Sequence, residues 1–364
     1  MSLTEREREI VALLRRDPLI GSAAIAGALG TTRAAVNVHL SNLGRKGVIL
    51  GRGYVLGTTP AVVVVGGANM DVKARSARSA VPATSNPGTA TITPGGVGRN
   101  VAENLARLGT RTHLVSVVGG DSLGDQVLAA TSAAGVHVEH VRRSTRPTGT
   151  YTAVLDADGE LVVAVADMTA ADDINTAQVG AARDLIANAE LLVLDGNLSP
   201  ETLAYALDLA VAAGVRVILE PVSVPKAAAR AHLVSPDRPL FAITPNRDEL
   251  ATLTGLPAGT AREVRKAAAA LHERGVRYVW THLGDRGSLL SGPDGAIPVD
   301  AVAADVVDVT GAGDAALAAF AHALLAGEDV AAAAAFGHAA ASLTIAGPHT
   351  VRPDLTDRLV RSTL

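Results

Sequence analysis

The sequence predicts an α/β protein in which helices cover both faces of a mainly parallel central sheet, preceded by a small helical domain. Between residues 191 and 280, short apolar runs alternate with segments of helical periodicity, the pattern of parallel strands joined by crossover helices. A chain of 364 residues accommodates one large domain and one small one. The charge pattern supports this division, and we expect domains at 1–57 and 58–364.

Charge is shared unevenly along the chain. Residues 1–57 contain eight Lys or Arg and four Asp or Glu, a net charge of +4, whereas the whole chain carries −4. The remainder therefore carries −8. This asymmetry indicates that the first domain meets a polyanion and that the second does not.

The first domain has the element order of a winged helix. Thr4 and Glu7 form a capping-box pattern, and the sequence predicts three short helices, at 4–16, 22–29 and 33–43. Short apolar runs on either side of the basic tip Gly51-Arg52-Gly53 predict two strands, the wing. Residues 57–60 read as a linker.

In winged helices the third helix enters the major groove and the wing reaches phosphates or the minor groove. The polar residues expected to contact duplex DNA are Thr31, Thr32, Arg33, Asn37, His39 and Arg52. The alternative is a dimerisation or regulatory module that does not bind DNA. Because four net charges support only weak affinity for one copy, we expect DNA binding to require a homodimer.

The second domain begins with the buried strand 61–65, which leads into Gly66-Gly67-Ala68-Asn69-Met70-Asp71. The spacing of a dinucleotide-binding motif is missing. Asn69 and Asp71 are two residues apart and therefore lie on one face of an extended segment. An amide and a carboxylate at the end of a strand suit adjacent sugar hydroxyls, although an Asx turn explains the same pattern.

Two further segments predict a small sheet that stands off the main one. Residues 84–94 read as a turn and a Thr-rich strand, and residues 148–167 read as a strand pair. Between them, Gly95-Gly96-Val97-Gly98-Arg99-Asn100 opens a helix expected at 101–108. Glycines in front of a helix let a ligand approach the backbone closely, and Asn100 can supply a side-chain hydrogen bond there.

Asn246 and Glu249 follow a predicted strand and open the helix 247–254. An Asn with a Glu three residues later is a capping box, but the same two side chains can also organise nucleotide phosphates and a hydrated magnesium ion. Both interpretations stay open on this evidence. A second glycine loop, at 283–287, follows the strand that contains Trp280.

The segment Asp308-Val-Thr310-Gly311-Ala312-Gly313-Asp314 runs directly into a helix-forming stretch. Unpaired backbone N–H groups and the positive end of the helix dipole therefore face one point, which suits an anion. A carboxylate beside that point suits proton abstraction during phosphoryl transfer. A plain glycine-rich turn is the alternative.

The composition and the apolar pattern of the chain bear on the cellular compartment of the protein. The chain contains no cysteine, which excludes disulfides and cysteine-based zinc sites. Its first residues lack the apolar region of a signal peptide, and no apolar run reaches the length of a membrane span. We therefore expect a cytoplasmic protein that does not contact membranes.

Taken together, Gly95-Gly96, Pro245-Asn246-x-x-Glu249 and Asp308-x-Thr310-Gly-Ala-Gly-Asp314 resemble the ribokinase-like (pfkB) carbohydrate kinase family over about residues 60–350. The resemblance implies a three-layer fold with a small β lid. It also implies ATP-dependent phosphorylation of an alcohol, with Asp314 as the base and Gly311, Ala312 and Gly313 as the anion hole.

The same resemblance implies roles for other positions. The substrate would be held by Asn69, Asp71, Gly95, Gly96, Asn100, Tyr151 and Asp167. ATP would be bound by Asn246, Gly284, Gly287 and His338. Glu249 would hold magnesium through water, and Asp308 and Thr310 belong to the family's potassium loop.

Within the family the likeness is to pseudouridine kinases, through Ser85-Asn86-Pro87-Gly88, the run 95–109, Asp167-Met168, 195–199 and Pro221-Val-Ser223. This implies phosphorylation of the 5'-hydroxyl of pseudouridine. Ala166 and Glu220 depart from the pattern, which usually has Asn and Asp there. Other nucleosides, a free sugar, or a sugar- or nucleoside-sensing DNA-binding regulator on a kinase fold are the alternatives.

Overall fold

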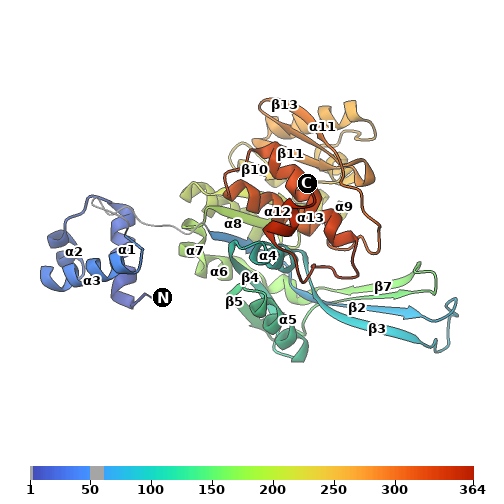
Figure 1. The fold of residues 1–364 in the computed structure, drawn as a ribbon, viewed down its shortest axis with the longest axis horizontal. Helices are drawn as coiled ribbons and strands as arrows, with labels where there is room; N and C mark the ends of the chain where they lie inside the picture. The colour runs from blue at the N-terminus through green and yellow to red at the C-terminus, as the bar shows by residue number, and fades with distance from the viewer. Residues whose placement is uncertain (1–2, 50–60) are drawn as a thin grey trace. The chain divides into compact units, whose positions relative to one another are not determined.

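The structure is a computed structural model that describes residues 3–49 and 61–364. The chain divides into two compact units, residues 1–59 and 60–364, which we describe separately (Figure 1). Arg52, the rest of the expected wing tip and the expected linker 57–60 lie outside the described residues. No described helix has the length and apolar character needed to cross a membrane.

The first unit contains three helices, α1 (Glu5–Arg16), α2 (Ser22–Ala28) and α3 (Arg33–Arg45). The predicted capping box is present, because Thr4 Oγ1 accepts from the backbone N–H of Glu7 and the Glu7 carboxylate accepts from that of Thr4. A core of its own holds the unit together, formed by Ile10, Val11, Leu14, Ile25, Ala26, Val36 and Leu43. Lys46 donates to the buried Glu7 at 2.7 Å and ties the end of α3 to α1.

The second unit is organised around a nine-stranded sheet in the order β13-β12-β11-β10-β9-β8-β1-β4-β5. All neighbouring strands from β5 to β11 are parallel, whereas β12 and β13 are antiparallel. The strands are β1 (Ala61–Val65), β4 (Arg111–Gly119), β5 (His137–Ser144), β8 (Leu191–Asp195), β9 (Arg216–Glu220), β10 (Leu240–Ile243), β11 (Val276–His282), β12 (Ser288–Gly292) and β13 (Gly295–Val299).

Helices cover both faces of this sheet, which confirms the predicted three-layer class. Val62 and Val64 of β1 face one apolar cluster and Val63 and Val65 face the other, as the alternation of a strand buried on both sides requires. One face packs against α4 (Val97–Arg107), α12 (Ala312–Leu325), α13 (Val330–Ile345) and α14 (Asp357–Arg361). The other packs against α6 (Thr176–Ala181), α7 (Arg183–Ala187), α8 (Pro200–Ala213), α9 (Val224–Arg230), α10 (Arg247–Thr254) and α11 (Ala261–Glu273).

The strand order reverses direction at β1. From β1 the chain moves outward to β4 and β5 on one side, and later returns to β8 on the other side. The loops that follow β1 and β8 therefore run in opposite directions from the carboxyl ends of these strands. Such a switch point is where open α/β sheets bind ligands.

A separate four-stranded sheet forms the lid, in the order β3-β2-β6-β7. Its strands are β2 (Asn69–Ser76), β3 (Gly88–Gly95), β6 (Thr150–Leu155) and β7 (Leu161–Asp167), and they extend away from the nine-stranded sheet (Figure 1). The lid includes β2, which the sequence did not predict as a strand. Helix α5 (Ser122–Ala133) packs near its base, against Met70 and Val118.

The helix expected at 101–108 begins four residues earlier, at Val97, so our start was wrong. Gly96 is its N-cap, and its φ of 98° lies in the left-handed region that favours glycine. A Cβ there would lie 2.5 Å from the carbonyl oxygen of Gly67. The two glycine segments thus pack directly on each other, and Arg99 and Asn100 belong to the first turns of α4.

Candidate active site

The centre of the site is the amino terminus of α12. Gly311 is the N-cap with a φ of 83°, and a Cβ on it would lie 2.0 Å from the carbonyl oxygen of Thr350. Only glycine fits this turn. Ala312, Gly313 and Asp314 form the first helical turn, and the Ala312 N–H donates to the carbonyl of Val309 at 3.3 Å. The N–H groups of Gly313 and Asp314 point out of the helix end beside the Asp314 carboxylate. The geometry is that of an anion site with a carboxylate at its side.

A chain of hydrogen bonds orients the Asp314 carboxylate. Arg99 Nη1 donates to Asn100 Oδ1 at 2.9 Å, and Asn100 Nδ2 donates to Asp314 Oδ2 at 2.8 Å. Because a guanidinium only donates, it fixes which end of the amide faces Asp314. Arg99 is in turn paired with the buried Glu103. Sequence reasoning missed Arg99, although its place next to Asn100 was a usable signal.

Burial raises the pKa of Asp314 from 3.8 to about 7. The hydrogen bond from Asn100 acts in the opposite direction, whereas the carboxylates of Asp195 and Asp71 raise the pKa further. A carboxylate whose pKa lies close to neutral pH is suited to general-base work, because a large fraction of it is ionised near pH 7 while it still binds a proton readily.

A cavity of about 340 Å³ lies between the lid and the glycine segments that contain Gly67 and Gly96. We call it the polar cavity after the polar side chains that line it. Of the predicted substrate residues it is lined by Asn69, Asp71, Gly96, Asn100 and Tyr151. Asp314, Gly311, Gly313 and Thr310 line it as well. One polar wall is therefore formed by the lid strand β2 and the opposite wall by the start of α12.

Asn69 and Asp71 share a face of β2, as predicted from their spacing. Asn69 Nδ2 donates to Asp71 Oδ1 at 2.7 Å, so the two side chains form a hydrogen-bonded pair on a strand rather than an Asx turn. Burial raises the pKa of Asp71, although the hydrogen bond from Asn69 lowers it. Gly95 does not line the cavity; a Cβ on it would lie 2.3 Å from Asp71 Oδ2, so it makes room for that carboxylate.

Asp167 does not lie in the cavity, so the structure does not place it with the other substrate residues. It is exposed on β7, and its Oδ1 accepts from the N–H and hydroxyl of Thr169 at 3.1 and 2.8 Å. Its neighbour Met168 lines the cavity instead. Asp167 is the register partner of Thr150 on β6, whereas the cavity-lining Tyr151 is the partner of Ala166, so Asp167 and Tyr151 lie on opposite faces of the lid.

Asp195 is a buried residue that sequence reasoning did not assign to the site. Its Oδ2 accepts from the N–H groups of Gly67 and Gly98, both at 2.9 Å, so one carboxylate holds the loop after β1 against the start of α4. Asn197, next along the loop after β8, also donates to it at 3.0 Å. Lys226 donates to Asn197 Oδ1, and both side chains line the polar cavity. In the sequence, the position of residues 195–197 directly after a central strand could have indicated that Asp195 and Asn197 belong to the site.

A second cavity, of about 770 Å³, lies on the other side of Asp314. All four predicted ATP residues line it: Asn246, Gly284, Gly287 and His338. Glu249, Glu220 and Thr244 contribute polar groups, and Val306, Val309 and Ile345 contribute apolar ones. Gly313 and Asp314 line both cavities. The carboxylate therefore stands at the border between the smaller cavity and the larger one.

Asn246 and Glu249 form the capping box that the sequence allowed. Asn246 Oδ1 accepts from the N–H of Glu249, and Glu249 Oε2 accepts from the N–H of Asn246, both at 2.9 Å. The same two side chains face the larger cavity, so capping and ligand binding are compatible. Burial raises the pKa of Glu249 and, more strongly, that of Glu220, which reaches about 8.

His338 is held by the core. Its Nε2 lies 2.7 Å from the hydroxyl of Ser288, which also accepts from the Trp280 indole N–H at 2.7 Å. Burial lowers the pKa of its imidazole, which favours the neutral form. His338 therefore contributes an imidazole ring to the cavity wall.

The expected potassium ligands have a different partner. Lys73 Nζ lies 2.5 Å from Asp308 Oδ2 and 3.1 Å from Thr310 Oγ1. Burial raises the pKa of Asp308, but hydrogen bonds from Lys73 and Thr310 outweigh this effect and the pKa is lowered overall. An ammonium group therefore contacts a side-chain oxygen of each of the two residues expected to bind potassium.

The DNA residues named from the sequence lie on or near α3 of the first unit. Thr32 is its N-cap and accepts from the N–H of Ala35 at 3.2 Å. Arg33 and Asn37 are exposed and four residues apart, so they lie on the same face of the helix. Thr31 and His39 are half-buried.

The fold and this arrangement define a ribokinase-like phosphotransferase whose acceptor is an alcohol group. Residues 59–357 match the family described as pfkB family carbohydrate kinase, and the chain belongs to that family. Residues 3–49 match the winged helix-turn-helix DNA-binding family. Both family resemblances expected from the sequence are confirmed.

Curated relatives extend the match. The chain is 34% identical over 356 residues to an uncharacterized sugar kinase, YeiI, of Escherichia coli K12, covering 97% of both chains. It is 36% identical over 300 residues to the pseudouridine kinase of the same organism, covering 81% of this chain and 93% of the relative. Arabidopsis thaliana ribokinase, solved with ribose and ATP, superposes with a TM-score of 0.70 at 27% identity, over 84% of this chain and 99% of that one.

Proposed function

We propose that this protein is an ATP-dependent kinase that phosphorylates the 5'-hydroxyl of a ribonucleoside, with pseudouridine as the expected substrate. The observation that carries the proposal is the position of Asp314 at the border of two cavities, beside the amino terminus of α12. A hydroxyl bound in the polar cavity and a phosphate bound in the larger one would meet at this carboxylate.

In this mechanism Asn69 and Asp71 bind adjacent sugar hydroxyls from one face of β2, because the carboxylate accepts hydrogen bonds and the amide can both donate and accept them. Asp314 takes the proton of the attacking hydroxyl. The hydroxyl oxygen bonds to the γ-phosphorus of ATP, the bond from that phosphorus to the bridging oxygen breaks, and ADP leaves. The N–H groups at the start of α12 stabilise the negative charge on the transferred phosphoryl group. The lid covers the cavity and excludes water that would otherwise hydrolyse ATP.

Magnesium fits the larger cavity. Oxygen donors suit this hard cation, and the cavity presents the side chains of Glu220, Asn246 and Glu249. We propose that Glu249 holds the ion through water. When bound, magnesium neutralises negative charge on the ATP phosphates.

The choice of pseudouridine is supported by the relative of that name at 36% identity. Asn197 and Lys226 extend the polar cavity beyond the sugar residues and offer hydrogen-bonding groups to a base. Incubation with ATP, Mg²⁺ and a panel of pseudouridine, uridine, other nucleosides and ribose tests the proposal through ADP formation and product mass. Preference for ribose would favour a sugar kinase, and no turnover with any acceptor would favour a sensing regulator.

We also propose that residues 1–57 bind duplex DNA. The support is the family match, the charge of +4 and the exposed Arg33 and Asn37 on α3. A homodimer would supply two such helices. The lid offers a surface for dimer formation, because Leu161, Val163 and Val165 of its edge strand β7 are each more than half exposed. Light scattering of the purified protein measures the oligomeric state.

A further inference from the structure

A lysine occupies the place where a monovalent cation was expected. Potassium binds to oxygen ligands, and the residues expected to supply them are Asp308 and Thr310, each of which has a side-chain oxygen. Both are in contact with Lys73 Nζ, at 2.5 and 3.1 Å. A second cation at the same oxygens would meet the repulsion of the ammonium group at close range. The residues present therefore do not fit a potassium ion at this position.

Lys73 reaches this position from the lid. It lies on β2 two residues after Asp71 and four after Asn69, so all three side chains share one face of the strand. The first two line the polar cavity, and the third extends to the loop before α12. One lid strand thus carries both the proposed sugar-binding pair and the cation.

The loop that Lys73 contacts leads directly into the anion site. Asp308 Oδ1 accepts from the N–H of Thr310 at 2.9 Å and from its hydroxyl at 2.6 Å. Gly311, the N-cap of α12, follows at once. The ammonium therefore fixes the two residues whose backbone sets the direction of the first N–H groups of the helix.

We propose that Lys73 is a built-in monovalent cation that takes the place of potassium at Asp308 and Thr310. It makes phosphoryl transfer independent of added potassium and links the position of the lid to the anion site. The role is one of positioning, and it rests on the proposed kinase function.

The test compares wild-type protein with Lys73→Met and Lys73→Ala, each in potassium, sodium or lithium chloride at equal ionic strength. Wild-type turnover should change less than about twofold between these salts. Lys73→Met should lose about 10- to 100-fold, the scale of a misplaced reactive geometry. In Lys73→Ala, which leaves room for an ion, potassium should restore activity and lithium should not. Arg75→Met, on the same face of β2 but outside both cavities, is the matched control.

Thermal unfolding gives a readout that does not depend on turnover. Lys73→Ala should gain a stabilisation by potassium relative to lithium, because an ion bound only by the folded protein raises its Tm. Wild type should gain none. A potassium-specific gain in wild type, or none in Lys73→Ala, overturns the proposal. If no acceptor is phosphorylated but the Tm pattern holds, the proposed function fails and the cation role stands.

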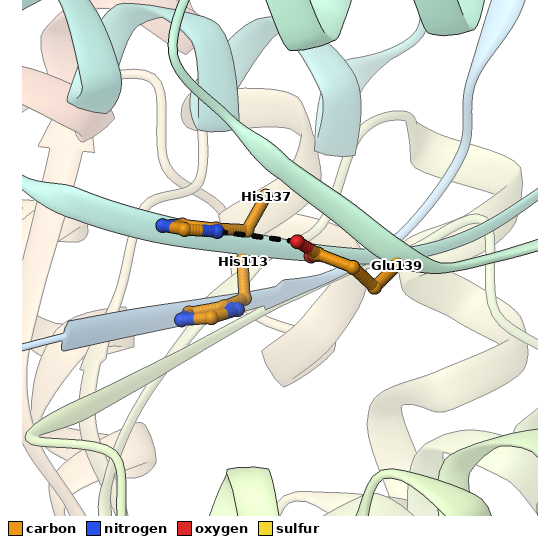
Figure 2. Close-up of side chains that lie close together, drawn as sticks. All are labelled: His113, His137 and Glu139. Atoms are coloured by element: carbon orange, nitrogen blue, oxygen red, sulfur yellow. Dashed lines mark hydrogen bonds and ion pairs between the residues drawn. The ribbon is translucent and has the colours of Figure 1, made fainter. Parts of the chain in front are cut away.

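A second inference concerns His113, His137 and Glu139, which lie together on β4 and β5 (Figure 2). His113 and His137 are direct partners in the strand register, and their rings stack with centroids 4.4 Å apart. His137 Nδ1 lies 3.4 Å from Glu139 Oε1. One candidate ligand atom from each residue lies within 4.8 Å of the others.

The cluster is remote from the proposed active site. It lies near the amino ends of two parallel strands whose carboxyl ends face the switch point. From His113 to Gly119, the end of β4, six residues of strand span about 20 Å. β5 is the edge strand of the sheet. A ligand at the cluster would therefore join an edge strand to its neighbour rather than take part in phosphoryl transfer.

We propose that these three side chains form a site for a divalent transition metal of the zinc class. Two imidazole nitrogens and a carboxylate oxygen are ligands that zinc favours, and water would complete the coordination. The rings are stacked, so their in-plane lone pairs run side by side. His137 is 40% exposed and can turn its ring to bring the two nitrogens onto one ion.

Titration of chelator-treated protein with zinc chloride tests this site by calorimetry. Wild type should bind one zinc ion per chain more tightly than His137→Ala or Glu139→Gln by at least about tenfold. His232→Ala, which removes an exposed histidine elsewhere, should bind like wild type. Zinc should raise the Tm of wild type and not that of His137→Ala. Equal zinc binding by wild type and His137→Ala overturns the proposal.

Discussion

Asn100 Nδ2 donates a hydrogen bond of 2.8 Å to Asp314 Oδ2, across 214 residues of sequence. The amide is oriented by Arg99 at its other end, and both residues lie in the first turns of α4. The carboxylate lies at the start of α12. Two helix amino termini therefore meet at one acidic group, which gives the site its geometry. Burial raises the pKa of this proposed base, and the hydrogen bond from Asn100 lowers it.

Asp314→Asn should keep nucleotide binding and lower turnover about 10²- to 10⁴-fold, the usual contribution of a general base. The amide is nearly isosteric but cannot accept the hydroxyl proton. Steady-state kinetics and ATP titration measure the two effects. Asp294→Asn, an exposed change in the β12–β13 turn, is the control. Turnover of Asp314→Asn within about threefold of wild type would remove Asp314 from the mechanism.

The pH dependence of kcat/KM should have an acidic limb near pH 7. The base acts in its ionised form, and the pKa of Asp314 is about 7. Below that pH the ratio should fall about tenfold per unit, and above it the ratio should level off. An acidic limb near pH 4 would show that the group which titrates in the free enzyme has an ordinary carboxyl pKa.

The same shift affects stability. Because the folded-state pKa of Asp314 is raised above 3.8, the native state binds more protons than the unfolded state between about pH 4 and 7. Its contribution to the free energy of unfolding therefore decreases as pH rises through that window. Asp314→Asn should be more stable relative to wild type at pH 8 than at pH 4, and thermal unfolding at both values measures the difference. An equal difference at the two pH values contradicts this sign.

Asn100→Ala should move the acidic limb to higher pH. The hydrogen bond from Asn100 lowers the pKa of Asp314, so its loss leaves burial and the nearby carboxylates less opposed. The pH profile of kcat/KM separates this effect from a general loss of activity. Asn188→Ala, on the protein surface, should leave the profile unchanged. A purely structural role for Asn100 would lower activity without shifting the limb.

A chain that begins at Thr59 should phosphorylate its substrate like the full-length protein and lose affinity for duplex DNA. The second unit has its own cores, and residues 67–345 include both cavities. In the full-length protein, Arg33→Ala should weaken DNA binding more than Arg16→Ala, which removes the same charge from α1. A salt-dependent titration of labelled promoter DNA measures this. Equal binding by the full-length and shortened chains would contradict the DNA proposal.

The sequence determined the class of the fold and much of the site. Alternating strand and helix patterns depend on local periodicity, so the parallel sheet and the helix 247–254 followed from the residues alone. The glycine segments 95–96 and 311–313 carry a local requirement for close backbone approach, so they marked the two helix starts that form the site. The bounds of the helices were harder to predict, since no local pattern places the start of α4 at Val97.

Tertiary structure decided which side chains meet. Asp195 accepts hydrogen bonds from the loop after β1 and from the start of α4, and Lys73 forms an ion pair with Asp308. Strand order and the position of the lid bring these residues together, although they are far apart in the chain. The sequence shows each of these charges but not its partner. The place of Asp167 outside the cavity has the same origin, since the side of a strand that faces a cavity depends on the register of the whole lid. Local patterns specify elements, whereas the partners of buried charges depend on packing between elements.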